Sequence, residues 1–474
     1  MAINSCGGGG AKRQRGDERG VSADRISALP DELRQRILTG LPFKDAIRTG
    51  VLARGWRNLW KSRWPHRASV EVHLGSRDDP QGELDALPRP CRRLDRFSLV
   101  VDTTKFKSTE LRGFTDYAAE CRVEDLHVDL QKSTLKILNL HLPLSSPLLA
   151  RLSLRGIGVT SSMYYLNAQP FRALEVIRLD SVDISQVGFK NMMALCPSLH
   201  TLELRHSNCD CFFYRPDSKG KRSRLVMPPN LKTVKVAYCR GHASLNLVPV
   251  PSLSSFWYIG DFVSKPFSLP EDAKLIDLYI RIVGEIPFVC NLSRALPIDL
   301  SGLTVLTICS NALKIAPSLA IEACPNLSNL QSLKELQLIL SRTDTKTLDN
   351  IYVFLRASHC HNLERLFVQL PDITHWSLED LGEKDGPPEH GLRNLRMVKV
   401  MRFNWHRFEV QLVSSLLRKA SSLHKLLLVS PSVTLPHVLG IQEADIAPLQ
   451  KALSSGLIMI LSKSNDRLTR PFHS

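Results

Sequence analysis

The sequence predicts an α/β protein in which a small helical module precedes a long array of stacked, strand-containing repeats. Two observations predict this fold: apolar helical patterns at residues 25–65, and a short Leu-rich pattern that recurs from about residue 91 to residue 432. The 474 residues suffice for two to four domains at about 150 residues each. With 43% hydrophobic and 23% charged residues, the composition is that of a globular protein.

The chain is strongly basic. Lys and Arg number 62 against 46 Asp and Glu, a formal net charge of +16, which keeps acidic protein surfaces and nucleic acid open as partners. No apolar run approaches the roughly 18 residues of a membrane helix, and the N-terminus lacks the apolar region of a signal peptide. We therefore expect an intracellular protein of the nucleus and/or cytoplasm, with no membrane partner. The 11 scattered cysteines predict reduced, mostly buried thiols.

Residues 1–24 are expected to form a disordered basic tail, because four consecutive glycines precede Lys12, Arg13 and Arg15 without apolar periodicity. A solubilising tail is the favoured interpretation, and a nuclear import signal is the alternative. A phosphate-binding loop is excluded, since the order G-x-x-x-x-G-K-[ST] does not occur there.

Residues 25–65 carry three short helical patterns. The first starts with Pro30 at a favoured first helical position, and Leu29, Leu33 and Ile37 then fall four residues apart on one face. Three helices in about 40 residues cannot bury all of their apolar side chains. Either a partner or a larger domain of this chain therefore covers the surplus, and the spacing alone leaves both open.

The stretch from Asp24 to Trp60 resembles an F-box of the plant type. It has two Leu-Pro dipeptides, an Arg-Thr-x-Val-Leu segment starting at Arg48 and a closing Trp-x-x-Leu-Trp, with Gly50 and Gly55 departing from the usual residues. The resemblance implies a three-helix domain that docks to the Skp adaptor of a cullin–RING ubiquitin ligase. The apolar docking surface it implies is drawn from Leu29, Pro30, Ile37, Leu38, Leu41, Pro42, Val51, Leu52, Trp56, Leu59 and Trp60.

The pattern L-x-x-L-x-L, with aliphatic or aromatic substitutes, recurs thirteen times at a mean spacing of about 27 residues. This period is that of leucine-rich repeats, in which each motif forms a strand and neighbouring units stack into a curved solenoid. An ordinary α/β domain with Leu-rich strands is the weaker alternative. The motifs begin at Leu94, Val123, Leu149, Leu174, Leu199, Leu231, Leu253, Leu275, Leu303, Leu333, Leu363, Leu395 and Leu423.

We assign the repeats to residues 91–391, after a linker at 66–90. Residues 392–430 resemble the FBD segment of plant F-box proteins, with the order strand, loop, helix near Phe408–Lys419, strand. Residues 392–462 are therefore expected to form FBD-like C-terminal repeats and a cap, and residues 463–474 a frayed tail. The whole chain thus resembles the plant F-box/FBD/leucine-rich-repeat family.

The outward strand positions of the repeats predict a concave recognition face. The residue between the last two anchors of each motif belongs to it: Ser98, His127, Ser153, Arg178, Glu203, Lys235, Trp257, Tyr279, Thr307, Gln337, Phe367, Lys399 and Leu427. Candidate target-binding residues on this face combine Arg or Lys with two aromatics, which is typical of binding hot spots. They are Arg151, Arg155, Arg178, Arg205, Lys235, Trp257 and Tyr279. Alternatively, the charges pair across strands and a loop covers the aromatics.

The sequence contains no complete motif for catalysis, and its nearest metal-like clusters, His359-Cys360-His361 and Cys209-x-Cys211, lack a second half. We therefore expect no enzyme, no metal and no cofactor. The resemblance implies a substrate-recognition subunit of an SCF-type ligase that holds an unknown target protein. The alternative is a basic repeat scaffold for acidic protein or nucleic acid, although no nucleic-acid motif accompanies the charge. A small anionic ligand on the concave arginines is a weaker third possibility.

Overall fold

In the computed structural model, the chain divides into two compact units, Met1–Ser69 and Val70–Ser474. The structure describes residues 69–87, 94–131, 148–159, 171–184, 186–209, 227–239, 245–247, 250–262, 267–284, 292–315, 327–371, 392–430, 443–461 and 470–473, together with Leu29, Pro30, Leu33, Arg34, Ile37, Leu38, Arg48, Thr49, Trp56 and Leu59.

The larger unit is organised around one sheet of 15 strands whose spatial order is their order in the chain. From the second strand to the last, every neighbouring pair is parallel. The strands are β1 (Ser69–Leu74), β2 (Arg96–Val101), β3 (Asp125–Leu130), β4 (Arg151–Arg155), β6 (Val176–Asp180), β8 (Thr201–Arg205), β10 (Thr233–Ala237), β12 (Ser255–Gly260), β14 (Asp277–Ile282), β15 (Val305–Cys309), β16 (Glu335–Ile339), β17 (Arg365–Gln369), β18 (Met397–Met401), β19 (Lys425–Val429) and β20 (Ile458–Leu461).

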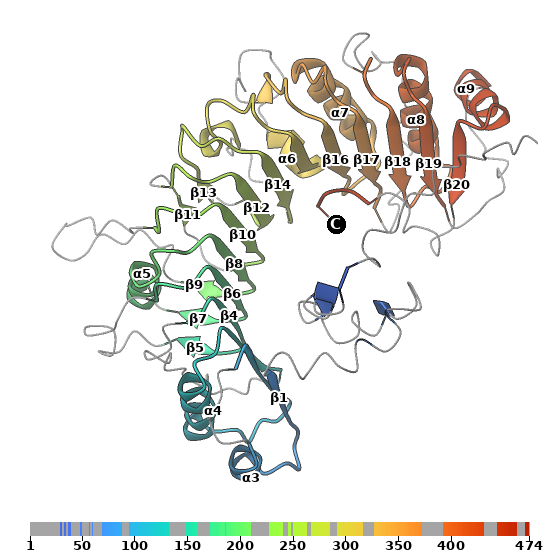
Figure 1. The fold of residues 1–474 in the computed structure, drawn as a ribbon. Helices are drawn as coiled ribbons and strands as arrows, with labels where there is room; N and C mark the ends of the chain where they lie inside the picture. Colours follow the sequence, from blue (N-terminus) through green and yellow to red (C-terminus); the bar gives the residue numbers. More distant parts are fainter. Residues whose placement is uncertain are drawn as a thin grey trace, which may run out of the picture. The chain divides into compact units, whose positions relative to one another are not determined.

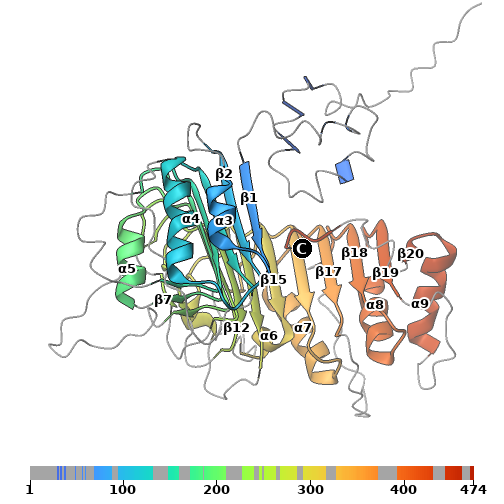
Figure 2. The same cartoon turned by 90° about the horizontal axis from the view of Figure 1, so that it is seen from below.

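Within this unit the sheet lines the inner side of an arc and the return segments lie on its outer side (Figures 1 and 2). Short outer strands form two accessory sheets, β5 (Gly158–Val159) with β7 (Asp183–Ile184) and β9 (Asn208–Cys209), and β11 (Leu245–Asn246) with β13 (Phe267–Ser268). The described helices are α3 (Pro80–Asp85), α4 (Ser108–Glu120), α5 (Gln186–Ala194), η5 (Leu292–Ala295), α6 (Ser310–Ile315), α7 (Thr345–Ala357), α8 (Arg407–Lys419) and α9 (Glu443–Ser454).

Each of the thirteen sequence motifs supplies one strand of the long sheet, from β2 to β19. In the motif LHTLEL, for example, Leu199, Leu202 and Leu204 are buried between the sheet and the outer layer. One unit cannot cover its own apolar face, so the leucines of successive units pack on one another along the array. The predicted α/β sheet of stacked repeats is confirmed.

The sheet extends one strand beyond the motifs at each end. β1 lies inside the region assigned to a linker, and its sequence SVEVHL alternates so that Val72 and Leu74 are buried. β20 follows α9 and pairs in parallel with β19. Neither strand carries the L-x-x-L-x-L pattern, so the repeat pattern does not predict them, and the helix α9 lies between β19 and β20.

The helix expected near Phe408–Lys419 is present as α8, and its apolar face packs into the core. Its N-terminus is capped by Glu409, whose Oε2 accepts hydrogen bonds from the amides of Asn404 (2.6 Å) and His406 (3.4 Å). Burial raises the pKa of Glu409 from 4.5 to about 7, against the lowering effect of these amides.

In the smaller unit, the amides of Leu33 and Arg34 donate to the carbonyl of Pro30, so a helical turn follows Pro30 as the sequence predicts. Leu38 and Trp56 are buried, whereas Leu33 and Ile37 are 45% and 43% exposed. The described apolar residues of this unit therefore include buried side chains, Leu38 and Trp56, and solvent-facing ones, Leu33 and Ile37.

Candidate functional site

A single row of side chains crosses the inner face of the long sheet. All thirteen residues expected between the motif anchors are register partners on successive strands, from Ser98 on β2 to Leu427 on β19. Neighbouring strands lie about 4.8 Å apart, so each side chain in the row is flanked by its neighbours. The predicted recognition row is therefore one continuous feature.

Exposure changes along this row. Between His127 and Trp257 most of its side chains are at least partly exposed, with Glu203 as the exception. From Tyr279 to Leu427 all of them are buried. The open part of the predicted face is thus confined to the first half of the array.

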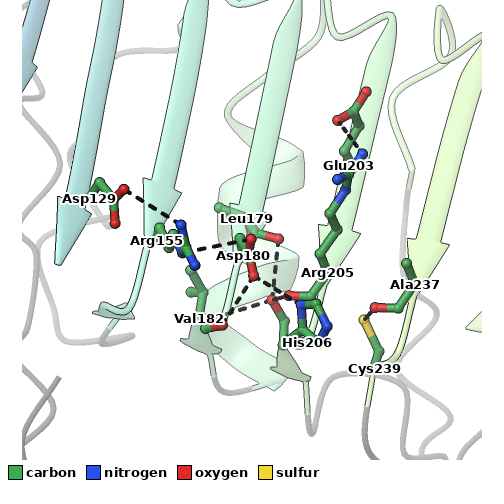
Figure 3. A network of polar contacts seen from close by, with 12 residues as sticks. Asp129, Arg155, Leu179, Asp180, Val182, Glu203, Arg205, His206, Ala237 and Cys239 are labelled. Carbon is green, nitrogen blue, oxygen red and sulfur yellow. Dashed lines mark hydrogen bonds and ion pairs between the residues drawn. The ribbon is translucent and has the colours of Figure 1, made fainter. Parts of the chain in front are cut away.

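The charged residues of the first half pair across strands (Figure 3). Arg155 on β4 lies between two carboxylates, with Nη1 3.7 Å from Asp129 Oδ2 on β3 and Nε 3.9 Å from Asp180 Oδ2 on β6. Asp180 Oδ1 also lies 3.2 Å from Nδ1 of His206 and accepts a hydrogen bond from the hydroxyl of Ser181.

Glu203 on β8 is the centre of a second group of ion pairs. Its Oε2 lies 3.3 Å from Arg178 Nε and 4.0 Å from Arg205 Nη2, and its Oε1 lies 3.5 Å from Lys235 Nζ. Together with the pairs around Arg155, four cations share three carboxylates. The expected basic patch is therefore largely neutralised by neighbouring carboxylates. This is the alternative given above, in which the charges pair across strands. Arg151, at the edge of this group, is exposed.

The expected aromatic pair occupies the middle of the row. The rings of Trp257 and Tyr279 stack with centroids 4.9 Å apart and planes 13° apart. Lys235 Nζ lies 4.4 Å from the centroid of the Trp257 ring, a cation–π contact. Burial raises the pKa of the Tyr279 hydroxyl, and only 7% of this residue is exposed. Tyr279 is therefore not the solvent-exposed side chain that the sequence analysis expected.

The C-terminal segment covers this pair. Residues 470–473 lie on the inner side of the arc (Figure 1), and the ring of His473 contacts Trp257 and Tyr279 edge-on at centroid distances of 4.5 and 5.5 Å. Its Nδ1 lies 2.7 Å from Thr307 Oγ1 and its Nε2 3.1 Å from Asp277 Oδ1. The frayed tail expected for 463–474 is therefore wrong for residues 470–473, because these contacts hold the imidazole in place.

The smaller unit carries the residues that the sequence analysis assigns to adaptor docking. Ile37 and Pro30 are exposed, and Leu29 and Leu59 are partly exposed. Leu38 and Trp56 are buried, which assigns them to the interior rather than to an outer surface. The remaining predicted residues lie outside the described part of the chain: Leu41, Pro42, Val51, Leu52 and Trp60.

Comparison with known families agrees with both units. The model of the family described as At1g61320/AtMIF1, LRR domain, matches residues 94–437, which is most of the chain, and the F-box domain model matches residues 26–68. The chain belongs to the plant F-box/leucine-rich-repeat family. Thirteen strands of the long sheet of this F-box/leucine-rich-repeat protein, β2 to β19, lie within the repeat match, and its smaller unit contains the F-box match.

One relative extends the similarity over 85% of the chain. The F-box/LRR-repeat protein At5g54820 of Arabidopsis thaliana is 23% identical over 447 residues, covering 85% of this chain and 89% of the relative. The FBD-associated F-box protein At1g66310 of the same plant is 26% identical, covering 68% and 79%. The F-box protein At1g60400 is 56% identical over 41 residues, covering 9% and 10%.

The described residues of this F-box/leucine-rich-repeat protein show no group of three or more His, Cys, Asp or Glu side chains placed to hold a metal ion. The His359-Cys360-His361 segment forms a corner between repeats, where Nδ1 of His359 lies 2.9 Å from the carbonyl oxygen of Ser328. Burial raises the pKa of the Cys196 thiol to about 12 and also raises the pKa of Cys309 and Cys360, so these thiols are poor nucleophiles at neutral pH. No helix in the described part of the chain is both long and apolar enough to cross a bilayer.

Sequence reasoning missed the residues that hold the C-terminal segment. Asp277 and Glu335 stand at the first outward position of β14 and β16, one position before the anchors that the motif search used. The one feature of the sequence that could have indicated Asp277 and Glu335 is their outward position on the strand. Nothing in the sequence RPFH at residues 470–473 predicts that it returns to strands more than 130 residues earlier.

Proposed function

We propose that this protein is a non-catalytic substrate-recognition subunit of an SCF-type (Skp–cullin–F-box) E3 ubiquitin ligase. In this role the smaller unit docks to the Skp adaptor and the inner face of the repeats holds a target protein. The F-box match and the F-box/LRR-repeat relatives carry the proposal. Ubiquitin transfer then follows from proximity, since a bound target reacts at a high effective concentration with the charged enzyme of the assembly.

The division of apolar residues in the smaller unit supports a docking role. Leu38 and Trp56 provide an interior, while Leu33 and Ile37, on the same predicted helix as Leu38, remain exposed. Large exposed aliphatic residues on a small domain are typical of an interaction surface. In the proposed complex Leu33 and Ile37 lie against the adaptor, and burying each contributes about 1.5–3 kcal/mol before the cost of association.

Two structural details belong to the same proposal. The F-box is proposed to form three helices. Residues 392–462, with the observed order β18, α8, β19, α9 and β20, are proposed to form the FBD-like end of the array. β20 covers the edge of the sheet that β19 would otherwise leave open, which is what a C-terminal cap must do.

The test is a titration of the purified full chain with a plant Skp adaptor. Ile37→Ala and the double variant Leu29→Ala, Pro30→Ala are expected to weaken adaptor binding at least tenfold. Ile298→Ala is a matched control, because Ile298 is an exposed aliphatic residue of the larger unit, 63% accessible, and it should leave binding unchanged. Adaptor binding that is undiminished in the Ile37 and Leu29/Pro30 variants would contradict the proposed surface.

The scaffold alternative predicts binding to phosphate-rich or acidic partners through the net charge of +16. The ion pairs of Arg155, Arg178, Arg205 and Lys235 argue against it on the inner face, because these cations are already matched by carboxylates. A salt titration separates the two proposals, since binding through phosphate contacts falls steeply with salt concentration.

A further inference from the structure

His473 occupies a pocket in the middle of the inner face. Its side chain is 0% exposed. The walls are the stacked rings of Trp257 and Tyr279, and the floor is formed by polar side chains of β14 and β15.

Both nitrogens of the His473 ring have a partner in this pocket. Nε2 lies 3.1 Å from Asp277 Oδ1, and Nδ1 lies 2.7 Å from Thr307 Oγ1. The Asp277 carboxylate is itself held, since Oδ1 accepts hydrogen bonds from Ser255 Oγ (2.8 Å) and Trp257 Nε1 (3.2 Å). Two fixed polar partners at opposite sides of a ring, between aromatic walls, match the shape and hydrogen bonding of an imidazole.

The residue before the histidine is bound through its backbone. The amide of Phe472 donates to Glu335 Oε1 at 2.5 Å, and Glu335, 1% exposed, is held by Arg365, whose Nη2 lies 2.8 Å from its Oε2. The Phe472 ring is not enclosed: the residue is 61% exposed, and its ring packs against the His473 ring at a centroid distance of 5.1 Å. The pocket therefore binds the backbone N–H of residue 472 and the imidazole of His473. It does not enclose the side chain of residue 472.

We propose that this pocket is the target-recognition site and that it binds an extended segment of a target protein through a histidine that follows any residue except proline. Proline is excluded because it lacks the N–H that Glu335 accepts. The chain's own Phe472-His473 occupies the site in cis, and a target binds by displacing it. The proposal gives the recognition chemistry of the ligase role described above, and it rests on that role for the identity of the ligand as a target.

Tethering makes this competition significant. Strand spacing places β20 about 20 Å from β16, a distance that the residues between Leu461 and Phe472 can span at about 3.3 Å each. A segment tethered this closely competes at an effective concentration in the millimolar range. The apparent affinity for a target is then reduced by the fraction of chains whose pocket is filled by the tail.

The experiment measures binding of a fluorescein-labelled peptide of residues 466–474 by fluorescence anisotropy. One protein is the full chain, and the other ends at Thr469. The peptide is expected to bind the shortened chain at least tenfold more tightly than the full chain, because only the shortened chain has an empty pocket. The full chain with His473→Phe lacks the imidazole that holds the tail in the pocket. It is therefore expected to bind the peptide as tightly as the shortened chain does.

Matched peptides test the chemistry of recognition. His473→Phe and Phe472→Pro in the peptide are each expected to weaken binding to the shortened chain at least tenfold, while Phe472→Ala is expected to change it less than threefold. Arg178→Ala in the shortened chain is a control on the same face and should not change peptide binding. Equal binding to the full and opened chains, or equal binding of the His473→Phe peptide, would overturn the proposal.

The two proposals fail separately. If the adaptor does not bind but the peptides discriminate as expected, the ligase role is lost and the histidine pocket stands. If the adaptor binds while the peptides do not discriminate, the pocket is lost and the ligase role stands.

Discussion

Nε2 of His473 lies 3.1 Å from Oδ1 of Asp277, a residue 196 positions earlier in the chain. In a solenoid most contacts join neighbouring units, so that stability is close to a sum over neighbours. This contact instead joins the C-terminal segment to the middle of the array. It makes the central repeats and the chain end depend on each other.

His473→Ala is expected to lower the free energy of unfolding by about 1–2 kcal/mol. The variant removes two hydrogen bonds in a buried pocket and the ring contacts with Trp257 and Tyr279, while Asp277 keeps its bonds to Ser255 and Trp257. Urea unfolding followed by circular dichroism measures the change. A variant as stable as the parent would contradict the docking of the tail.

Glu203→Gln is expected to lower the free energy of unfolding by about 1 kcal/mol, because Arg178, Arg205 and Lys235 lose their shared carboxylate. The value is modest since the two arginine side chains are about half exposed and solvent screens them. Urea unfolding at low salt and at 1 M NaCl tests this, with a smaller difference expected at high salt. Arg151→Ala, at an exposed position of the same face, is the control and should be nearly neutral.

Glu409 is expected to make stability fall as the pH rises from 5 to 8. Its pKa is 4.5 as the ordinary value and about 7 in the folded protein, so between these values the folded state binds more protons than the unfolded state. The loss from this group is at most about 3 kcal/mol.

Glu409→Gln should remove this part of the pH dependence, because its amide oxygen can still accept from Asn404 and His406. Urea unfolding of both proteins at pH 5 and pH 8 isolates the contribution, since all other groups titrate in both. An identical pH dependence in the two proteins would show that the Glu409 carboxyl does not titrate as described.

The thiols of Cys196, Cys309 and Cys360 are expected to resist alkylation in the native protein at pH 8. All three are buried, and burial raises the pKa of each. Peptide mass spectrometry after treatment with iodoacetamide reads each cysteine separately, and the same treatment in 8 M urea is the control. Modification of these three peptides at equal rates with and without urea would contradict their burial.

Local pattern predicted most of the fold. The L-x-x-L-x-L motif determines both where a strand lies and which side chains face each side of the sheet. Side chains alternate along a strand, and the leucines must point into the core. This is why thirteen strands and the row from Ser98 to Leu427 follow from sequence. β1 and β20 did not follow, because an end strand packs on one side only and does not need the full motif.

The sequence predicted which residues lie in the candidate site, but it did not predict how their side chains pair or which of them are buried. The stacking of Trp257 on Tyr279 follows from equal positions in neighbouring motifs. The pairing of Glu203 with three cations depends on which long side chains of its own and the two neighbouring strands turn toward it, and several arrangements satisfy the same sequence. In the smaller unit, the burial of Leu38 beside the exposed Ile37 likewise depended on packing.

The sequence by itself determined the repeats, their register, and the F-box resemblance, because periodic apolar residues and dense local motifs specify structure over short distances. Only the tertiary structure decided that the basic residues of the inner face are paired and that His473 covers the aromatic pair. Both depend on side chains from distant parts of the chain meeting with suitable geometry. No local pattern near Pro471 or Asp277 encodes that meeting.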